Sequence, residues 1–168
     1  MPLIRNGQFT KETWLQLGDD AALPGTGDII VSLERWRAER EALLARSGRL
    51  GIRLRPDQPP RLIADDLGHF ALVALEFPAF KDGRAYSHAR VLRQRYGFAG
   101  EVRAAGEVLR DQLLFMVRCG FDAFEVAEDL TREDWRAALA EFSVFYQRAA
   151  DGREPAWALR HARAAVAE

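Results

Sequence analysis

The chain has 168 residues, of which 48% are hydrophobic and 29% charged, and its formal net charge is −1 at pH 7. These values fit one globular domain and argue against a general nucleic-acid binder, whose surface would be strongly basic. No apolar run approaches the roughly 20 residues of a membrane helix, and the first residues lack the basic and apolar regions of a signal peptide. We therefore expect a cytoplasmic protein with no membrane or nucleic-acid partner.

Metal and cofactor chemistry finds little support in the residue types. Cys119 is the only cysteine, so neither an internal disulfide nor a thiolate metal cluster can form. The three histidines lie far apart in the sequence and form no ligand pair at helical spacing. No signature of a flavin, haem, iron–sulfur or nicotinamide site is recognisable. We expect no metal and no cofactor, and an independent redox enzyme is disfavoured.

Residues 1–27 are predicted to form a β-hairpin followed by a loop. Asn6-Gly7 lies between two short apolar segments, which is a strong hairpin signal. Such a hairpin would cover a sheet edge or mediate a homo-oligomer. The stretch from Asp19 to Gly27 is rich in proline and glycine and is predicted to be a loop.

Strands and helices alternate from residue 28 onward. Residues 28–31 form a short apolar strand, and Ser32 is suited to cap a helix that runs to about Arg46. Gly48 is placed to end that helix. The first predicted strand–helix unit therefore spans residues 28–48.

The second strand has two different faces. Ile52 and Leu54 alternate with Arg53 and Arg55, so one face is apolar and the other is expected to be exposed or to line a pocket. Pro59-Pro60 then opens a short helix.

Residues 70–75 carry the strongest strand signal. Their continuous apolarity predicts burial on both faces, as in a parallel sheet. The elements predicted after this strand are a helix over 85–96, a strand over 101–105, a helix over 108–119, a strand over 121–126, and a helix that opens at Thr131 and continues to Tyr146.

This order predicts a single α/β domain over residues 1–150, with the strand–helix units in 28–147. Because such crossovers are right-handed and join parallel strands, we expect a mainly parallel sheet of about five strands. The pattern leaves two architectures open, an open doubly wound sheet and a partial barrel. Residues 151–168 form a tail that is either a docked helix or disordered.

In parallel α/β folds, ligands bind outside the carboxyl ends of the strands. Several polar side chains lie within, end or follow the third, fourth and fifth predicted strands. They are Glu76, Lys81, Arg84, Arg103, Glu107, Gln112 and Glu125.

Two roles are predicted from this set. Lys81 and Arg84, with Asp82 between them, could bind an oxyanion close to a helix N-terminus, or they could flank a solvated turn. Glu76 and Glu107 could act as acid and base on a substrate that these cations hold.

Arg103 and Gln112 complete the predicted binding set. Arg103 stands in mid-strand and must face solvent, pair with Glu76 or Glu125, or line a pocket. Gln112 shares a helix face with apolar residues, so its amide is expected to be buried and either structural or used to orient a ligand.

Residues 51–147 resemble a family of bacterial proteins, domain of unknown function 934. The motifs that carry the resemblance are Pro56-Asp57-Gln58-Pro59-Pro60, Ala74-Leu75-Glu76-Phe77-Pro78, Asp82-Gly83-Arg84 with Tyr86-Ser87, Arg95-Tyr96-Gly97-Phe98, Val108-Leu109-Arg110-Asp111-Gln112-Leu113 and Cys119-Gly120-Phe121-Asp122-Ala123-Phe124. The chain departs from the family pattern at Ala85, His88 and Glu107, where glycine, glutamine and aspartate are usual.

The resemblance implies a link to sulfur metabolism, because genes of this family accompany those of assimilatory sulfate reduction. It supplies no catalytic residues. A weaker similarity concerns strands that end in Glu76-Phe77-Pro78 and Gly106-Glu107, which resemble barrel strands of the enolase superfamily and favour barrel-like curvature.

Three functions are therefore carried forward. The first is an accessory protein of assimilatory sulfate and sulfite reduction that binds a small oxyanion or a partner such as sulfite reductase. The second is a small enzyme that performs acid–base chemistry on an anionic substrate. The third is a structural interaction module.

Overall fold

The computed structural model describes residues 2–165, and its strands form one eight-stranded sheet. The strands are β1 (Leu3–Arg5), β2 (Gln8–Thr10), β3 (Leu15–Gln16), β4 (Ile29–Ser32), β5 (Leu50–Leu54), β6 (Phe70–Phe77), β7 (Glu101–Gly106) and β8 (Ala123–Glu125). The helices are α1 (Leu33–Ala45), the 3₁₀ helix η1 (Pro60–His69), α2 (Arg84–Arg90), its π-helical continuation η2 (Val91–Arg95), the 3₁₀ turn η3 (Arg110–Gln112), α3 (Leu113–Cys119), α4 (Arg132–Ala140) and α5 (Ala156–Ala165).

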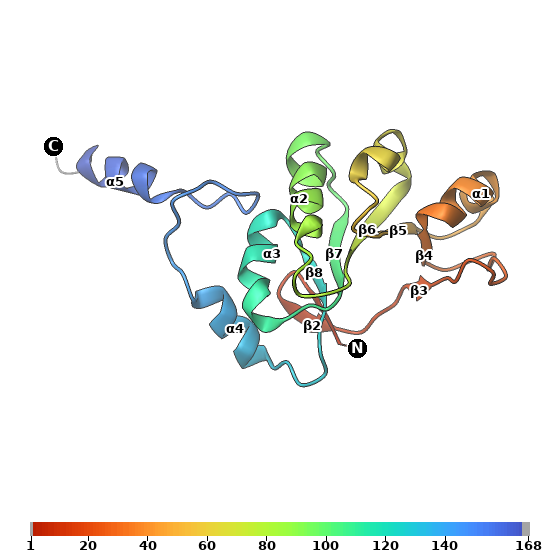
Figure 1. Cartoon of the computed structure of the whole chain (residues 1–168), viewed down its shortest axis with the longest axis horizontal. Helices are drawn as coiled ribbons and strands as arrows, with labels where there is room; N and C mark the ends of the chain where they lie inside the picture. Colours follow the sequence, from red (N-terminus) through yellow and green to blue (C-terminus); the bar gives the residue numbers. More distant parts are fainter. Residues whose placement is uncertain (1, 166–168) are drawn as a thin grey trace.

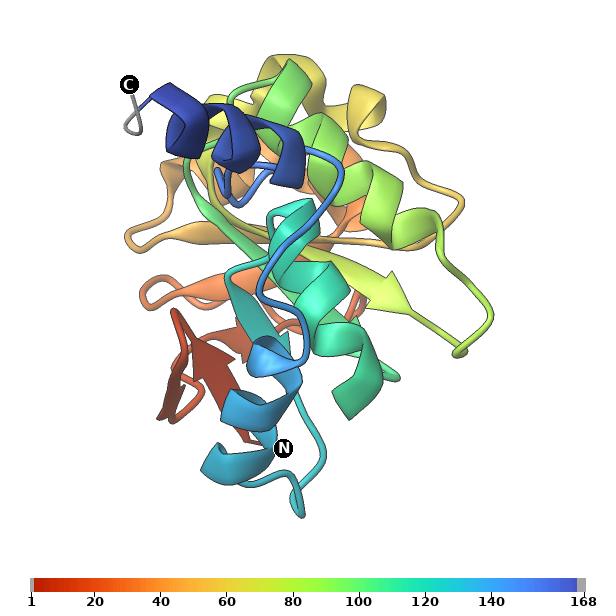
Figure 2. The ribbon, with the colours of Figure 1, turned by 90° about the vertical axis from the view of Figure 1, so that its left-hand side faces the viewer.

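The sheet curls into half a barrel, in the strand order β2-β1-β8-β7-β6-β5-β4-β3 (Figures 1 and 2). Strands β3 to β8 pair in parallel, and β1 joins antiparallel to both β2 and β8. Helices α1 to α4 cover the convex side of the sheet. The segment between β2 and β3 instead crosses the concave side, as Figure 1 shows below the strands.

Both faces of the central strand are buried, as the sequence predicts for residues 70–75. In β6 the side chains of Val73, Leu75 and Phe77 join the main core under the helices. Leu72 and Ala74 point to the opposite face, where they form a small apolar cluster with Trp14 and Ile30. Strand β6 therefore separates a large apolar core from a concave face that is only partly apolar.

The predicted N-terminal hairpin is confirmed. Asn6 and Gly7 both have positive φ, 48° and 75°, as the two central residues of a type I′ turn require. The hairpin adds to the sheet through β1, whose Ile4 lies opposite Phe124 of β8. It thus covers the β8 edge of the sheet, which is one of the two roles expected for it.

Two expectations about the architecture need correction. The sheet has eight strands rather than about five, because the hairpin joins it and because β3, with two residues, is too short to give a strand pattern in the sequence. The open doubly wound alternative is wrong, since the helices cover one face and the sheet curls. The partial-barrel alternative describes the structure.

The helix that opens at Thr131 is shorter than predicted. Thr131 caps α4, and its side chain and that of Asp134 bond reciprocally to each other's backbone N–H groups. The helix ends at Ala140, and the side chain of Tyr146, predicted to continue its apolar stripe, is 83% exposed. None of the described helices combines the length and apolarity needed to cross a membrane.

The chain beyond α4 is attached to the body at the end of α3. Arg118 lies 3.7 Å from the ring centroid of Phe145 and donates a hydrogen bond to the carbonyl of Gln147. Residues 156–165 form α5, so this part of the tail is helical, and residues 166–168 lie outside the described residues.

Gly106 ends β7 in a conformation that a side chain would disturb. Its φ is +94°, and an added Cβ would lie 2.5 Å from the carbonyl oxygen of Phe77. We expect Gly106→Ala to lower the free energy of unfolding by at least about 1–2 kcal/mol. Gly68→Ala is the control, since nothing lies within 4 Å of its added Cβ, and we expect a change within about 0.5 kcal/mol. Urea unfolding measures both, and equal effects would contradict the assignment.

Candidate functional site

A row of arginines and alanines crosses the concave face of the sheet. Arg53 of β5 lies opposite Ala74 of β6, which lies opposite Arg103 of β7. Arg103 in turn lies opposite Ala123 of β8, and Ala123 lies opposite Arg5 of β1. Because an alanine separates each pair of arginines, the long side chains have room to lie across the face of the sheet.

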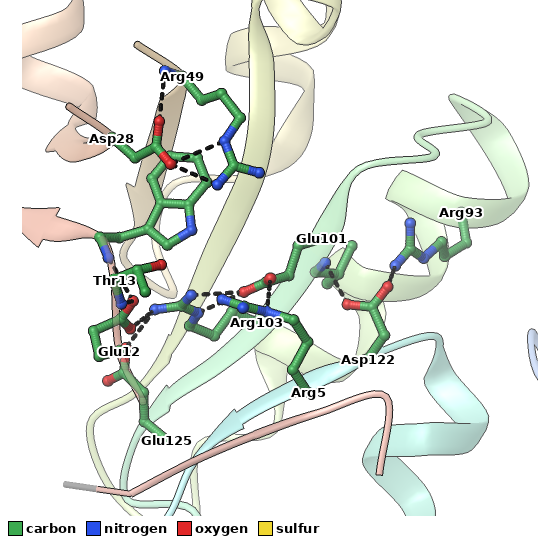
Figure 3. Close-up of polar contacts among 12 residues, drawn as sticks. Arg5, Glu12, Thr13, Asp28, Arg49, Arg93, Glu101, Arg103, Asp122 and Glu125 are labelled. Carbon is green, nitrogen blue, oxygen red and sulfur yellow. Dashed lines mark hydrogen bonds and ion pairs between the residues drawn. The ribbon is translucent and has the colours of Figure 1, made fainter. Parts of the chain in front are cut away.

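Arg103 is completely buried at the centre of this row. Its guanidinium contacts three carboxylates, which we call with it the Arg103 cluster (Figure 3). Glu101 lies 2.8 Å from Nε, Glu125 lies 3.6 Å from Nη1, and Glu12 from the segment before β3 contacts Nη1 directly. Arg5 adds a second cation, with Nε 2.6 Å from Glu101.

Burial also affects the protonation of Glu125. Desolvation raises the pKa of its carboxyl, and the nearby guanidinium groups of Arg53 and Arg103 oppose that rise. An ionised arginine is tolerated inside a protein only when carboxylates and hydrogen bonds replace water around it. The Arg103 cluster supplies both.

A cavity of about 380 Å³ opens beside the cluster, at the carboxyl ends of β4, β5 and β6. We call it the mouth cavity. It is lined by Gln16, Leu17, Gly18, Asp19, Ile30, Val31, Ser32, Glu34, Arg53, Arg55, Gln58 and Glu76. Ligands of parallel α/β proteins bind at this end of the strands.

Two arginines and the start of a helix line the mouth cavity. Nε of Arg53 lies 2.8 Å from Glu76, and its Nη1 donates to Gln16. Arg55 pairs with Glu34 at 2.6 Å. The Ser32 hydroxyl accepts a hydrogen bond from the backbone N–H of Arg35 and so caps α1, as predicted. Positive groups therefore face the cavity together with carboxylates.

Apart from Gln112, the residues predicted to bind or react fall into two separate groups. Glu76 lines the mouth cavity, and Arg103 and Glu125 form the floor of the concave face beside it. Glu76 and Glu125 both lie near Arg53, at 2.8 Å and 4.0 Å. Of the two carboxylates expected to pair with Arg103, Glu125 does so, whereas Glu76 pairs with Arg53.

The second group lies on the loop before α2. Lys81 is exposed, and Arg84 pairs with Asp82 at 2.6 Å, which keeps the pKa of Asp82 below its usual value. The Glu107 carboxylate accepts a hydrogen bond from the backbone N–H of Phe80 and thereby holds this loop. In the described contacts Arg84 and Arg103 share no partner.

Gln112 is buried and its hydrogen bond is local. Its side-chain oxygen accepts from the backbone N–H of Leu109 at 3.2 Å. Gln112 also lines an apolar surface groove with Phe80, Tyr86 and Phe115, away from the mouth cavity. This hydrogen bond fixes the backbone just before α3, so the contact supports a structural role for Gln112.

The sequence contains a signal that Arg53 and Arg55 belong to the site, but it contains none for Glu12. The alternation of Arg53 and Arg55 with apolar residues predicted an exposed or pocket-lining face, and these two arginines line the mouth cavity. Glu12 gave no signal, because it reaches Arg103 across 91 residues of sequence. Within residues 2–165, no group of three or more histidine, cysteine, aspartate or glutamate side chains is placed to hold a metal ion.

The comparison with protein families gives one match. The model of a family described as "Bacterial protein of unknown function (DUF934)" matches residues 51–157. This range begins within β5 and contains Arg53, Arg55, Glu76 and Arg103, but it leaves out Glu12. Among curated proteins, none matches the chain.

The Arg103 cluster predicts a large difference between two arginine variants. Arg103→Met leaves three carboxylates on the concave face without their shared cation, and we expect it to cost about 3–5 kcal/mol of unfolding free energy. Arg84→Met removes an exposed pair and is expected to leave the free energy of unfolding close to that of the wild type. Urea unfolding of both variants tests this, and similar losses would show that Arg103 is not buried among carboxylates.

Glu125 predicts a pH effect of definite sign. Because the folded state raises its pKa, the folded protein binds more protons than the unfolded chain between about pH 4.5, the ordinary value, and the folded-state pKa. The contribution of Glu125 to stability therefore decreases as pH rises from that value through its folded-state pKa. We expect the stability of the wild type relative to Glu125→Gln to decrease over this window in urea unfolding at successive pH values. An increase with pH in the stability of the wild type relative to Glu125→Gln would contradict the raised pKa of Glu125.

Proposed function

The chain belongs to the bacterial family DUF934, whose function is unknown, and we propose that it is an accessory protein of assimilatory sulfate and sulfite reduction that binds a small oxyanion in the mouth cavity. The sulfur context rests on the gene neighbourhood that the family resemblance implies. The place of binding rests on the geometry of the cavity.

The observation that supports this site is that Arg53 and Arg55 lie in the same cavity as the capped start of α1. Both guanidinium groups line the same cavity as Ser32, the residue that caps the helix. Guanidinium groups bind oxyanions through charge-assisted, often bidentate hydrogen bonds, and the helix N-terminus adds a positive potential. The oxyanion site is therefore proposed here rather than at the exposed loop of Lys81 and Arg84.

The carboxylates of the mouth cavity narrow the class of ligand. Asp19, Glu34 and Glu76 line it beside the two arginines. A compact dianion would meet their repulsion, whereas a ligand that also carries hydroxyl or amino groups would donate hydrogen bonds to them. The volume of about 380 Å³ also suits a small organic molecule. An oxyanion attached to a polar organic group, such as adenylyl sulfate, satisfies both conditions.

A second candidate function is acid–base catalysis at the same place, and one observation favours it. Glu76 and Glu125 approach the same guanidinium group of Arg53, and burial raises the pKa of Glu125. Two carboxylates in different environments can serve as acid and base in one reaction. Under this alternative, Arg53 and Arg55 hold the substrate anion and Glu76, which lines the cavity, exchanges the proton.

Ligand-dependent melting tests the proposed site. At 100 times its dissociation constant a ligand adds about 2.7 kcal/mol, which raises the melting temperature by several degrees in a domain of this size. We expect such a rise with adenylyl sulfate, and a smaller one with sulfite or sulfate. Arg53→Gln and Arg55→Gln should abolish the rise, and Arg84→Gln should keep it.

The variants in the mouth cavity, Arg53→Gln and Arg55→Gln, and the loop variant Arg84→Gln are controls for each other. Loss of the effect in Arg84→Gln alone would return the oxyanion site to the loop before α2. Absence of any rise with all three anions, together with co-purification of sulfite reductase, would favour the interaction module instead.

The metabolic role has its own test. We expect a strain without the gene to grow on sulfide and to grow poorly on sulfate or sulfite as the only sulfur source. Complementation by the wild-type gene, but not by the Arg55→Gln variant, would connect the growth defect to the mouth cavity. Normal growth of the deletion strain on sulfate would contradict the role in sulfur assimilation.

A further inference from the structure

The carboxylate of Glu12 is bound by backbone N–H groups and by a guanidinium, which are groups that also bind external anions. It belongs to residues 11–14, which we call the strap, an irregular segment between β2 and β3 that crosses the concave face. One oxygen accepts hydrogen bonds from the backbone N–H groups of Thr13 and Trp14, both at 2.8 Å. The other oxygen contacts Nη1 of Arg103 (Figure 3).

Glu12 lies between Arg103 and solvent. The side chain of Arg103 is 0% exposed, whereas that of Glu12 is 34% exposed. Glu101 and Glu125, the other partners of Arg103, extend from β7 and β8 themselves. Glu12 is the partner of Arg103 contributed by a segment without regular structure, so its carboxylate can be removed while the sheet contacts remain.

A buried donor without a hydrogen-bond acceptor lies beside the Arg103 cluster. Nη2 of Arg103 itself forms an ion pair with Glu101 at 2.7 Å. Arg5 donates to the same Glu101 through Nε, whereas its Nη2 is buried without a hydrogen-bond acceptor. Buried donors without acceptors are uncommon in folded proteins and indicate a position that another acceptor can fill.

The strap itself is anchored elsewhere. Trp14 packs against Ile30 and Leu72 on the concave face, and the Arg49 guanidinium lies 4.8 Å from the Trp14 ring centroid. These contacts do not involve the carboxylate of Glu12. Loss of that carboxylate therefore leaves the strap attached and opens a space next to Arg103.

We propose that Arg103 is the centre of a second anion site, separate from the mouth cavity, and that Glu12 fills it in the free protein. The site takes a compact monoanion of the size and charge of a carboxylate group. Arg103 supplies the charge, the backbone N–H groups of Thr13 and Trp14 supply hydrogen bonds, and Nη2 of Arg5 is a further donor. Glu12 competes with any external anion for this position.

Chemical rescue of a Glu12 variant tests the proposal. We expect Glu12→Ala to melt below the wild type, and sodium formate to raise its melting temperature in a concentration-dependent way. Sodium chloride at equal ionic strength should not reproduce the effect. Glu41→Ala, which removes an exposed glutamate of α1, is the control and should show no specific response to formate.

A second variant keeps the test valid if Glu12→Ala fails to fold. Glu12→Ser shortens the side chain, removes its negative charge and keeps a polar group, so we expect it to bind formate at least about 10-fold more tightly than the wild type in calorimetric titration. Formate binding should persist in Glu12→Ser with Arg55→Gln, which separates this site from the mouth cavity. Equal responses to formate and chloride, or equal formate affinity of Glu12→Ser and the wild type, would overturn the proposal.

Discussion

The structure depends on the burial of one guanidinium group against three carboxylates. Arg103 lies completely buried on the concave face of the half barrel, where its charge must be neutralised within the protein. Strand β7 supplies Glu101, β8 supplies Glu125 and the strap supplies Glu12. This single group therefore connects the N-terminal segment to the middle of the sheet.

The same interaction decides where a ligand can enter. On the convex side, the described helices and a large apolar core cover β6 and β7. On the concave side, the strap covers Arg103 and Trp14 fills the space over β4 and β6. What stays open is the mouth cavity at the carboxyl ends of β4 to β6, where Arg53 links the Arg103 cluster to solvent.

Local sequence patterns predicted the parts of the fold that local physics determines. The Asn6-Gly7 turn, the cap at Ser32 and the doubly buried strand at residues 70–75 follow from backbone conformation and periodicity. Glu76 is a predicted site residue because ligands bind at the carboxyl ends of parallel strands, and Arg103 is one because a charge in mid-strand must face solvent, be paired or line a pocket. The curl of the sheet and the contact of Glu12 with Arg103 depend on pairing between distant segments, which no local pattern encodes.

A double-mutant cycle between Glu12 and Arg103 tests most directly whether the strap closes the concave face through this ion pair. The free energies of unfolding of the wild type, Glu12→Gln, Arg103→Gln and the double variant are to be measured in urea. The structure predicts a coupling energy of about 1–3 kcal/mol between the two positions. Additive effects, within about 0.5 kcal/mol, would show that the two side chains do not interact and would contradict the account.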